Sequence, residues 1–324
     1  MIKQLFLLLT TCVFCLPGLT WSQAIDNTAA FRNSNSNNYF RINYENDFFT
    51  GTDRDYTQGI YIEWVNHSFS HLPLLGLFRN PRYSNIKYGV ALEHNAYTPN
   101  IIADAAVQLG DRPYAGVILL KSFATAINAE RRERITSMLS TGLIGPWAGG
   151  EGMQKGIHHW IHYTQPKGWN NQIKNDFVIN YQLNYEKELV RWKDHFSFSS
   201  YNVGRLGSLS IKATTGLTAM LGDFNSPFDT QHTNPKKKFH FYLYDNAAVS
   251  AVGYDATLQG GLLNRSSIYT IPSENIKRVT FVNRFGLVVE FNKLWIEYYQ
   301  SGPTQEFSTS VYHRSGGLQV GFNL

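Results

Sequence analysis

Long segments of this sequence alternate apolar and polar side chains with a period of two. Segment 177–185 places Phe177, Ile179, Tyr181, Leu183 and Tyr185 on one face of an extended chain. Segments 207–222 and 279–291 continue the alternation well beyond the roughly five or six residues of an ordinary soluble strand. They suit the roughly 9–11 residues of a tilted membrane strand with extensions beyond the bilayer. The alternation therefore predicts an all-β fold, a transmembrane antiparallel β-barrel.

The composition agrees with this prediction. Aromatic residues make up 15% of the chain and charged residues 16%, below the roughly 25% of charged residues in soluble domains. Mean hydropathy is −0.28, and no segment after residue 24 offers the roughly 20 consecutive apolar residues of a spanning helix. The alternative on composition is a periplasmic β-sandwich or barrel.

The N-terminus predicts a secretory signal peptide over residues 1–24. Lys3 precedes the apolar run 5–16, and Ser22 and Ala24 supply the small residues of a cleavage site. Both cysteines of the sequence, Cys12 and Cys15, lie in this segment. The rest of the chain, 25–324, is predicted to be a single outer-membrane barrel domain without disulfides.

About twelve strands are expected, near 37–47, 57–66, 86–97, 113–128, 133–144, 176–188, 195–205, 207–222, 239–252, 276–291, 293–301 and 311–324. An even number places both termini on the periplasmic side and the loops after odd-numbered strands outside. Tyr61, Tyr298 and Tyr299 are expected to point inward and fill a lumen that is narrow in a barrel of this size.

Three loops that follow odd-numbered strands carry unusual polar residues: 45–57, 108–116 and 145–172. Because all three loops follow odd-numbered strands, they are expected to meet at the same, outer rim of the barrel. Within 153–162 a short helix would put Gln154 and His158 on one face, and histidine is the commonest general base. Glu45 and Asp47, two residues apart, could supply oxygen ligands to a hard divalent cation. The alternatives are a histidine at the membrane interface and a solvated turn.

The motifs ENDFF…DRDYTQG, GDRPYAG, IGPWAGGE…Q…H, PKGWNNQ and YDATLQGGLLN, in this order, resemble the outer-membrane lipid A 3′-O-deacylase family. The resemblance implies a twelve-stranded barrel that removes the 3′-linked acyloxyacyl group from lipid A with a divalent cation, Ca²⁺ being preferred. Carried over by motif, the site residues are Asn46, Asp47, Thr57, Gln154, His158 and Arg112.

One position departs from the family pattern. Leu109 stands where the resemblance implies a lysine that stabilises the oxyanion. Either the cation and backbone N–H groups suffice for that purpose, or Arg112 or Lys155 takes the place of the missing lysine.

The predicted reaction is metal-assisted ester hydrolysis with His158 as general base and a cation held by Asp47 and Glu45. A rival mechanism makes Thr57 the nucleophile. The expected partner is lipid A, or lipopolysaccharide, in the outer leaflet, and the net charge of +5 suits this anionic lipid. No nucleic acid is expected, and the protein is predicted to be a monomer in the bacterial outer membrane. The alternatives are an outer-membrane phospholipase and a non-enzymatic, porin-like barrel.

Overall fold

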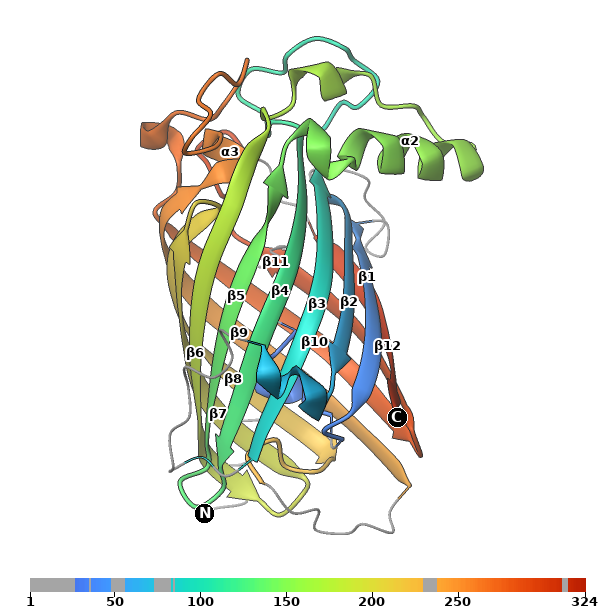
Figure 1. Cartoon of the computed structure of the whole chain (residues 1–324), viewed down its shortest axis with the longest axis vertical. Coiled ribbons are helices and arrows are strands. Elements are labelled where there is room, and N and C mark those ends of the chain that lie inside the picture. The colour runs from blue at the N-terminus through green and yellow to red at the C-terminus, as the bar shows by residue number, and fades with distance from the viewer. Residues whose placement is uncertain are drawn as a thin grey trace, which may run out of the picture.

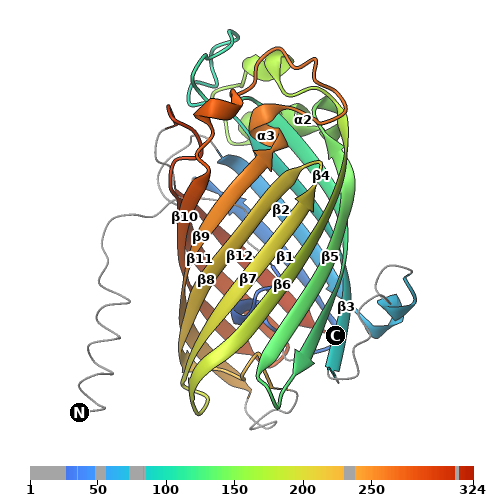
Figure 2. The ribbon, with the colours of Figure 1, turned by 90° about the vertical axis from the view of Figure 1, so that its left-hand side faces the viewer.

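The computed structural model describes residues 27–34, 36–47, 56–72, 83, 85–229, 238–310 and 314–324. Within them twelve strands form a closed barrel in which each strand pairs antiparallel with its neighbours in sequence and β1 pairs with β12 (Figures 1 and 2). The strands are β1 (Tyr39–Asn46), β2 (Tyr56–Val65), β3 (Asn85–Tyr97), β4 (Ala115–Asn128), β5 (Glu133–Ile144), β6 (Asp176–Trp192), β7 (Phe196–Gly207), β8 (Ser210–Asp223), β9 (Phe239–Asp255), β10 (Val279–Phe291), β11 (Leu294–Pro303) and β12 (Ser315–Asn323).

The predicted fold class and all twelve predicted strands are confirmed, with boundaries that differ by a few residues. Tyr39 at the start of β1 pairs with Asn323 at the end of β12, so the barrel begins and finishes at one end. The described parts of the loops after β3, β5, β7, β9 and β11 lie at the other, upper end in Figure 1. The predicted signal peptide lies outside the described residues and stays a prediction.

Alternation sorts the side chains between the two faces of the wall. On β1, Arg41, Asn43 and Glu45 are buried inside the barrel, while Ile42 between them is exposed on the outside. Tyr61 and Tyr299 are buried inside, as predicted. The inward prediction for Tyr298 is wrong. It lies opposite the exposed Leu318 of β12, and residues directly opposite share a face.

Residues 27–34, which precede β1, fill part of the lumen (Figure 2). They include the short 3₁₀ helix η1 (Ala30–Arg32). Arg32 Nε lies 2.9 Å from Glu297 Oε2 of β11, and the Phe31 ring stacks on Tyr244 of β9 at 4.2 Å. Ala30 N donates to Glu186 Oε2 of β6 at 2.9 Å. Contacts to strands on several sides of the barrel identify this segment as an internal plug.

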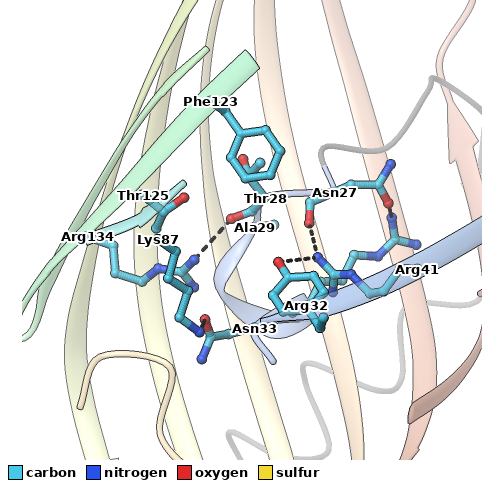
Figure 3. A pocket seen from close by; sticks show the side chains of 11 residues that line it. Asn27, Thr28, Ala29, Arg32, Asn33, Arg41, Lys87, Phe123, Thr125 and Arg134 are labelled. Atoms are coloured by element: carbon cyan, nitrogen blue, oxygen red, sulfur yellow. Dashed lines mark hydrogen bonds between the residues drawn. The ribbon is translucent and has the colours of Figure 1, made fainter. Parts of the chain in front are cut away.

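Basic side chains of the wall hold both ends of the plug (Figure 3). Arg134 donates to the Thr28 carbonyl at 3.2 Å, and Arg41 donates to the Asn27 carbonyl at 3.3 Å. Lys87 Nζ donates to Asn33 Oδ1 at 3.2 Å. Backbone carbonyls of an irregular segment thus find donors from the wall, as buried polar groups require.

Most short helices lie at the upper end of the barrel (Figure 1). They are η5 (Pro146–Ala148), α2 (Gly150–Trp160), η6 (Gly168–Asn171), α3 (Ala256–Gln259) and η7 (Ser273–Asn275), whereas η3 (His67–His71) follows β2 at the lower end. The helix predicted within 153–162 is confirmed as α2. None of the helices in the described part of the chain is long and apolar enough to cross a membrane.

Candidate active site

Two glycines direct the chain from β5 into α2. Gly145 has φ +100° and Gly149 has φ +76°, a left-handed region that other residues enter only at a steric cost. Between them Pro146 occupies the first position of η5, where its missing N–H is not needed. The sequence GPWAGG therefore encodes two sharp turns that bring α2 back onto the barrel.

The start of α2 is attached to the outer surface of β3 and β4. His94 of β3 points outward yet is only 5% exposed, because its Nε2 lies 3.0 Å from the Ala148 carbonyl oxygen. A Cβ on Gly116 of β4 would lie 3.3 Å from Gly150 N, so the absence of a side chain there permits the close approach. α2 consequently lies against the lipid-facing side of the wall and not over the lumen.

His158 lies on the buried face of α2 and is held in one tautomer. Gly150, Gln154 and His158, spaced by four, are the buried residues of this helix, and His158 is 4% exposed. Its Nδ1 lies 2.5 Å from the Thr164 carbonyl oxygen, and its ring meets Tyr163 edge-on at 5.2 Å. A carbonyl oxygen can only accept, so Nδ1 carries the proton. In the neutral ring Nε2 therefore carries the basic lone pair.

Gln154 is fixed by the indole of Trp169. Trp169 Nε1 donates to Gln154 Oε1 at 2.6 Å, and Gln154 is 1% exposed. Trp169, in η6, packs in turn on the Tyr114 ring at 5.0 Å. Burial raises the pKa of Tyr114 to about 12, so its phenol stays neutral at ordinary pH. The amide thus presents Oε1 to a fixed donor and keeps its NH₂ group for other contacts.

The end of β1 carries three of the predicted residues. Glu45 points into the barrel, where Ser315 Oγ donates to its Oε1 at 3.0 Å. Asn46 follows on the outer face, and its Nδ2 donates to the hydroxyl of Tyr44 at 3.2 Å. Asp47 comes next and is fully buried. Glu45 and Asn46 therefore belong to opposite faces of the wall.

Thr57 lies near the start of β2, beside a register irregularity between Tyr56 and Gln58. Its side chain is outside the described residues, as are Asp53 and Asp55 of the preceding loop. Gln58 pairs with Ala96 of β3 and is buried. The top of β2 therefore adjoins the part of β3 that lies next to η5.

Strand register places the end of β1 close to α2. Tyr44, Ile60 and His94 are direct partners across β1, β2 and β3. Two strand spacings separate Tyr44 from His94, about 10 Å. The eleven residues of α2 extend for about 16 Å. Figure 1 shows the helix running in the direction in which β3, β2 and β1 follow one another. Gln154, His158 and Asn46 thus share one sector of the outer wall.

Arg112 occupies a different place, at the mouth of the barrel. It forms an ion pair with Glu306, donates to Thr257 Oγ1 at 2.8 Å and lies 4.2 Å from the ring centroid of Tyr97. Thr257 belongs to α3 and Glu306 to the loop after β11, so Arg112 connects three extracellular segments. Its buried guanidinium is engaged in loop packing.

Leu109, which stands where a lysine was expected, and Lys155, one candidate to replace that lysine, both lie away from the buried face of α2. Leu109 is 82% exposed at the tip of its loop. Lys155 pairs with Glu151 at 2.6 Å on the solvent side of the helix. Neither residue therefore places a positive charge beside His158.

The model of the family described as "Outer membrane protein LpxR" matches residues 6–324. The chain belongs to the LpxR family. The solved structure "LpxR from Salmonella typhimurium" has the same fold, with a TM-score of 0.72 and 18% sequence identity over 88% of this chain and all (100%) of that one. The resemblance read from the sequence motifs is confirmed, and with it localisation in the bacterial outer membrane.

Two other solved barrels are less similar to this LpxR family member. They are the β domain of the Bordetella autotransporter BrkA (TM-score 0.46, 6% identity, covering 90% of this chain and 100% of that one) and the translocator domain of NalP from Neisseria meningitidis (TM-score 0.39, 11% identity, covering 91% of each chain). No curated protein sequence matches.

A cation site can be tested against the donors of this LpxR chain. Among the residues that the structure describes, no three His, Cys, Asp or Glu side chains gather to hold a metal ion. Glu45 and Asp47 nevertheless place two buried carboxylates at the end of β1, the oxygen ligands that hard cations prefer. They fit as part of a calcium shell, and further oxygens have to come from other groups.

Sequence reasoning missed the structural importance of two residues of this LpxR chain. His94 attaches η5 to the wall, and Trp169 orients Gln154. His94 carries a weak signal, because it occupies an outward strand position where aliphatic residues dominate. Trp169 lies in the recognised PKGWNNQ block, but its contact with Gln154 spans fifteen residues and has no periodic signature.

Proposed function

We propose that the chain is an outer-membrane ester hydrolase that removes the 3′-linked acyloxyacyl chain from lipid A. The supporting observation is the setting of His158, a buried imidazole whose Nδ1 is bonded to the Thr164 carbonyl, on the lipid-facing side of an LpxR-family barrel. A base in this position can act on a lipid ester without the lipid leaving the outer leaflet.

The proposed reaction uses water as nucleophile. His158 Nε2 takes a proton from water while the water oxygen bonds to the ester carbonyl carbon. The tetrahedral oxyanion then expels the sugar oxygen, which takes the proton from Nε2 and leaves as the 3′-hydroxyl. The Thr164 carbonyl supports the transient imidazolium through Nδ1–H.

The neighbouring residues have distinct proposed roles. Gln154, oriented by Trp169, donates from its amide to the water or to the oxyanion. Asn46 shapes the outer wall at the end of β1, and Thr57 positions the water. Arg112 was expected at the catalytic centre, and its contacts at the barrel mouth support a positioning role for the loops.

Asp47 would hold the divalent cation that the family resemblance implies, Ca²⁺ being preferred by that resemblance, and a buried carboxylate is an oxygen donor that such a cation takes. Glu45, the second proposed ligand, would have to approach from the interior side of the wall, where Ser315 donates to it. When bound, such a cation polarises the ester carbonyl and neutralises developing negative charge. We propose that the protein works on lipopolysaccharide as a monomer.

The deciding experiment is mass spectrometry of lipid A from cells that express the wild type or a variant. We expect the wild type to remove one 3′ acyloxyacyl group and His158→Ala to lose activity by roughly 10²–10⁴. The matched control is His159→Ala, which changes the exposed neighbour on the same helix and should retain activity. Lysophospholipid with intact lipid A would favour a phospholipase, and unchanged lipids with altered solute uptake would favour a porin.

The cation is tested separately. Chelation should abolish deacylation by the purified protein and Ca²⁺ should restore it. Asp47→Ala should lower the rate on the order of 10²–10³, because one electrostatic contact to the reacting group is lost. Terbium luminescence, which does not depend on turnover, should report weaker binding in the same variant. Unchanged terbium affinity in both Asp47→Ala and Glu45→Ala would remove these two residues from the metal site.

A further inference from the structure

The far end of α2 and the residues that follow it carry large apolar side chains that are exposed, although Tyr163 also meets the ring of His158. Trp160 is 81% exposed, and Ile161 and Tyr163 are exposed as well. Figure 1 shows this end of the helix extending beyond the outline of the barrel. We name Trp160, Ile161 and Tyr163 the helix tip. An exposed group of this kind on a lateral extension needs an apolar neighbour.

Strand register shows which outward residues of the wall adjoin η5 and the start of α2. His94, which binds η5, is in one row across the wall with Ile118, Leu143 and the exposed Phe177. Trp147 of η5 lies 6.2 Å from Phe177, ring centroid to ring centroid. Exposed aromatic residues near the rim of a membrane barrel are typical of the boundary between lipid and water.

The next row down is aliphatic and exposed. It runs through Leu92, Leu120, Thr141 and Ile179, of which the three aliphatic residues face outward without cover. The outer wall next to η5 is therefore exposed and aliphatic, as a lipid-facing surface is. On the side toward which α2 extends, the same row continues from Leu92 through Ile62 of β2 to the exposed Ile42 of β1, so the helix tip projects beside lipid-facing wall.

Charge supports the same neighbour. Residues 150–175 contain Lys155, Lys167 and Lys174 and a single acidic residue, Glu151, which pairs with Lys155. A basic segment that carries tryptophan and aliphatic residues on an amphipathic helix is typical of an interfacial anchor at an anionic membrane surface.

We propose that the helix tip inserts into the outer leaflet and anchors α2 to the anionic lipid surface beside the barrel. The anchor fixes the outer end of the helix in the plane of the leaflet, while His94 and Gly116 fix its inner end on the wall. Its consequence for catalysis rests on the proposed function, because His158 lies between these two attachments.

A spin label tests the anchor without any enzyme assay. The chain from residue 25 onward contains no cysteine, so Ile161→Cys can carry a single nitroxide. In vesicles of lipopolysaccharide and phospholipid, relaxation by oxygen should exceed relaxation by a water-soluble nickel chelate. Leu109→Cys is the matched control, because Leu109 is also exposed but lies on a loop bonded across the barrel mouth to Thr309. It should show the opposite preference, and a water-exposed label at 161 would overturn the proposal.

Activity provides the second measurement. Trp160→Ala should lower deacylation of lipid A in vesicles by roughly tenfold, because the variant buries less apolar surface in the membrane. Its activity in detergent should be unchanged. Equal losses of activity in vesicles and in detergent would overturn the anchor. A changed oligomeric state of the variant in detergent would also overturn it, because it would show that the helix tip is a protein interface. If the wild-type protein does not deacylate lipid A but the label at 161 lies in lipid, the proposed function fails and the anchor stands.

Discussion

At the scale of single residues, one carbonyl decides what His158 can do. The Thr164 oxygen holds the proton on Nδ1, so the basic nitrogen is the one on the other side of the ring. Trp169 has a similar effect on Gln154, because an indole can only donate and therefore fixes which end of the amide is the oxygen. Neighbours that take no part in the proposed reaction thus fix the tautomer of His158 and the orientation of the Gln154 amide.

Trp169→Phe tests this orientation. The change removes the Nε1–H donor and keeps most of the buried ring, so we expect the fold to persist and kcat to fall roughly tenfold, with a smaller change in KM. Steady-state kinetics on purified lipid A provide the measurement. Trp147→Phe is the control, because the exposed Trp147 contacts Asn175 through its backbone N–H. An unchanged kcat for Trp169→Phe would show that the indole is only a packing residue.

At the scale of elements, α2 depends on the absence of side chains where it meets its surroundings. A Cβ on Gly150 would lie 2.7 Å from the Trp169 ring, closer than atoms can approach without a shift. At Gly152, two residues further along, nothing lies within 4 Å of an added Cβ. Close packing therefore requires a glycine at position 150, whereas a side chain can be added at position 152.

Gly150→Ala should displace α2 from Trp169 and reduce deacylation by about tenfold or more, since a shift of about 1 Å in a catalytic group has effects of this size or larger. Gly152→Ala should retain activity and stabilise the helix by up to about 1 kcal/mol. Activity assays together with thermal unfolding of the two variants check this pair. Equal activity of both variants would contradict the close packing at Gly150.

At the scale of the whole molecule, the barrel is closed internally by its own N-terminal segment. The plug residues Phe31 and Arg32 are buried against β9 and β11, and the ion pair between Arg32 and Glu297 is fully shielded from solvent. The cluster around them includes Tyr242, Tyr244 and Tyr299. This barrel therefore has a packed interior, which distinguishes it from a porin-like channel.

Arg32→Ala should destabilise the protein by about 3–5 kcal/mol, because it leaves the Glu297 carboxylate buried without its cation. The measurement is the temperature at which the folded barrel loses its anomalous migration on a detergent gel. Arg131→Ala, at an exposed arginine in the turn between β4 and β5, should unfold at the wild-type temperature. Equal stability of the two variants would mean that the Arg32–Glu297 ion pair does not stabilise the barrel.

Much of the architecture and of the site follows from periodicity. A strand presents successive side chains to opposite faces, so alternation in β6 or β10 predicts a two-faced wall. Parity then brings the loops after β1, β3 and β5 to one end, and the four-residue spacing of Gln154 and His158 puts both on one helical face. Periodicity is ambiguous where adjacent residues are both aromatic, and this ambiguity explains the wrong orientation predicted for Tyr298.

The barrel, its strand number, the shared rim of the polar loops and the helix that carries His158 could all be predicted from sequence, because they depend on local repeats of two or about four residues. Tertiary structure alone decided that residues 27–34 fill the lumen, that Arg112 reaches Glu306, and that His94 lies beneath η5. These contacts join residues far apart in the chain. Their energies come from burying charges and polar groups together, and such pairings leave no regular pattern in a single sequence.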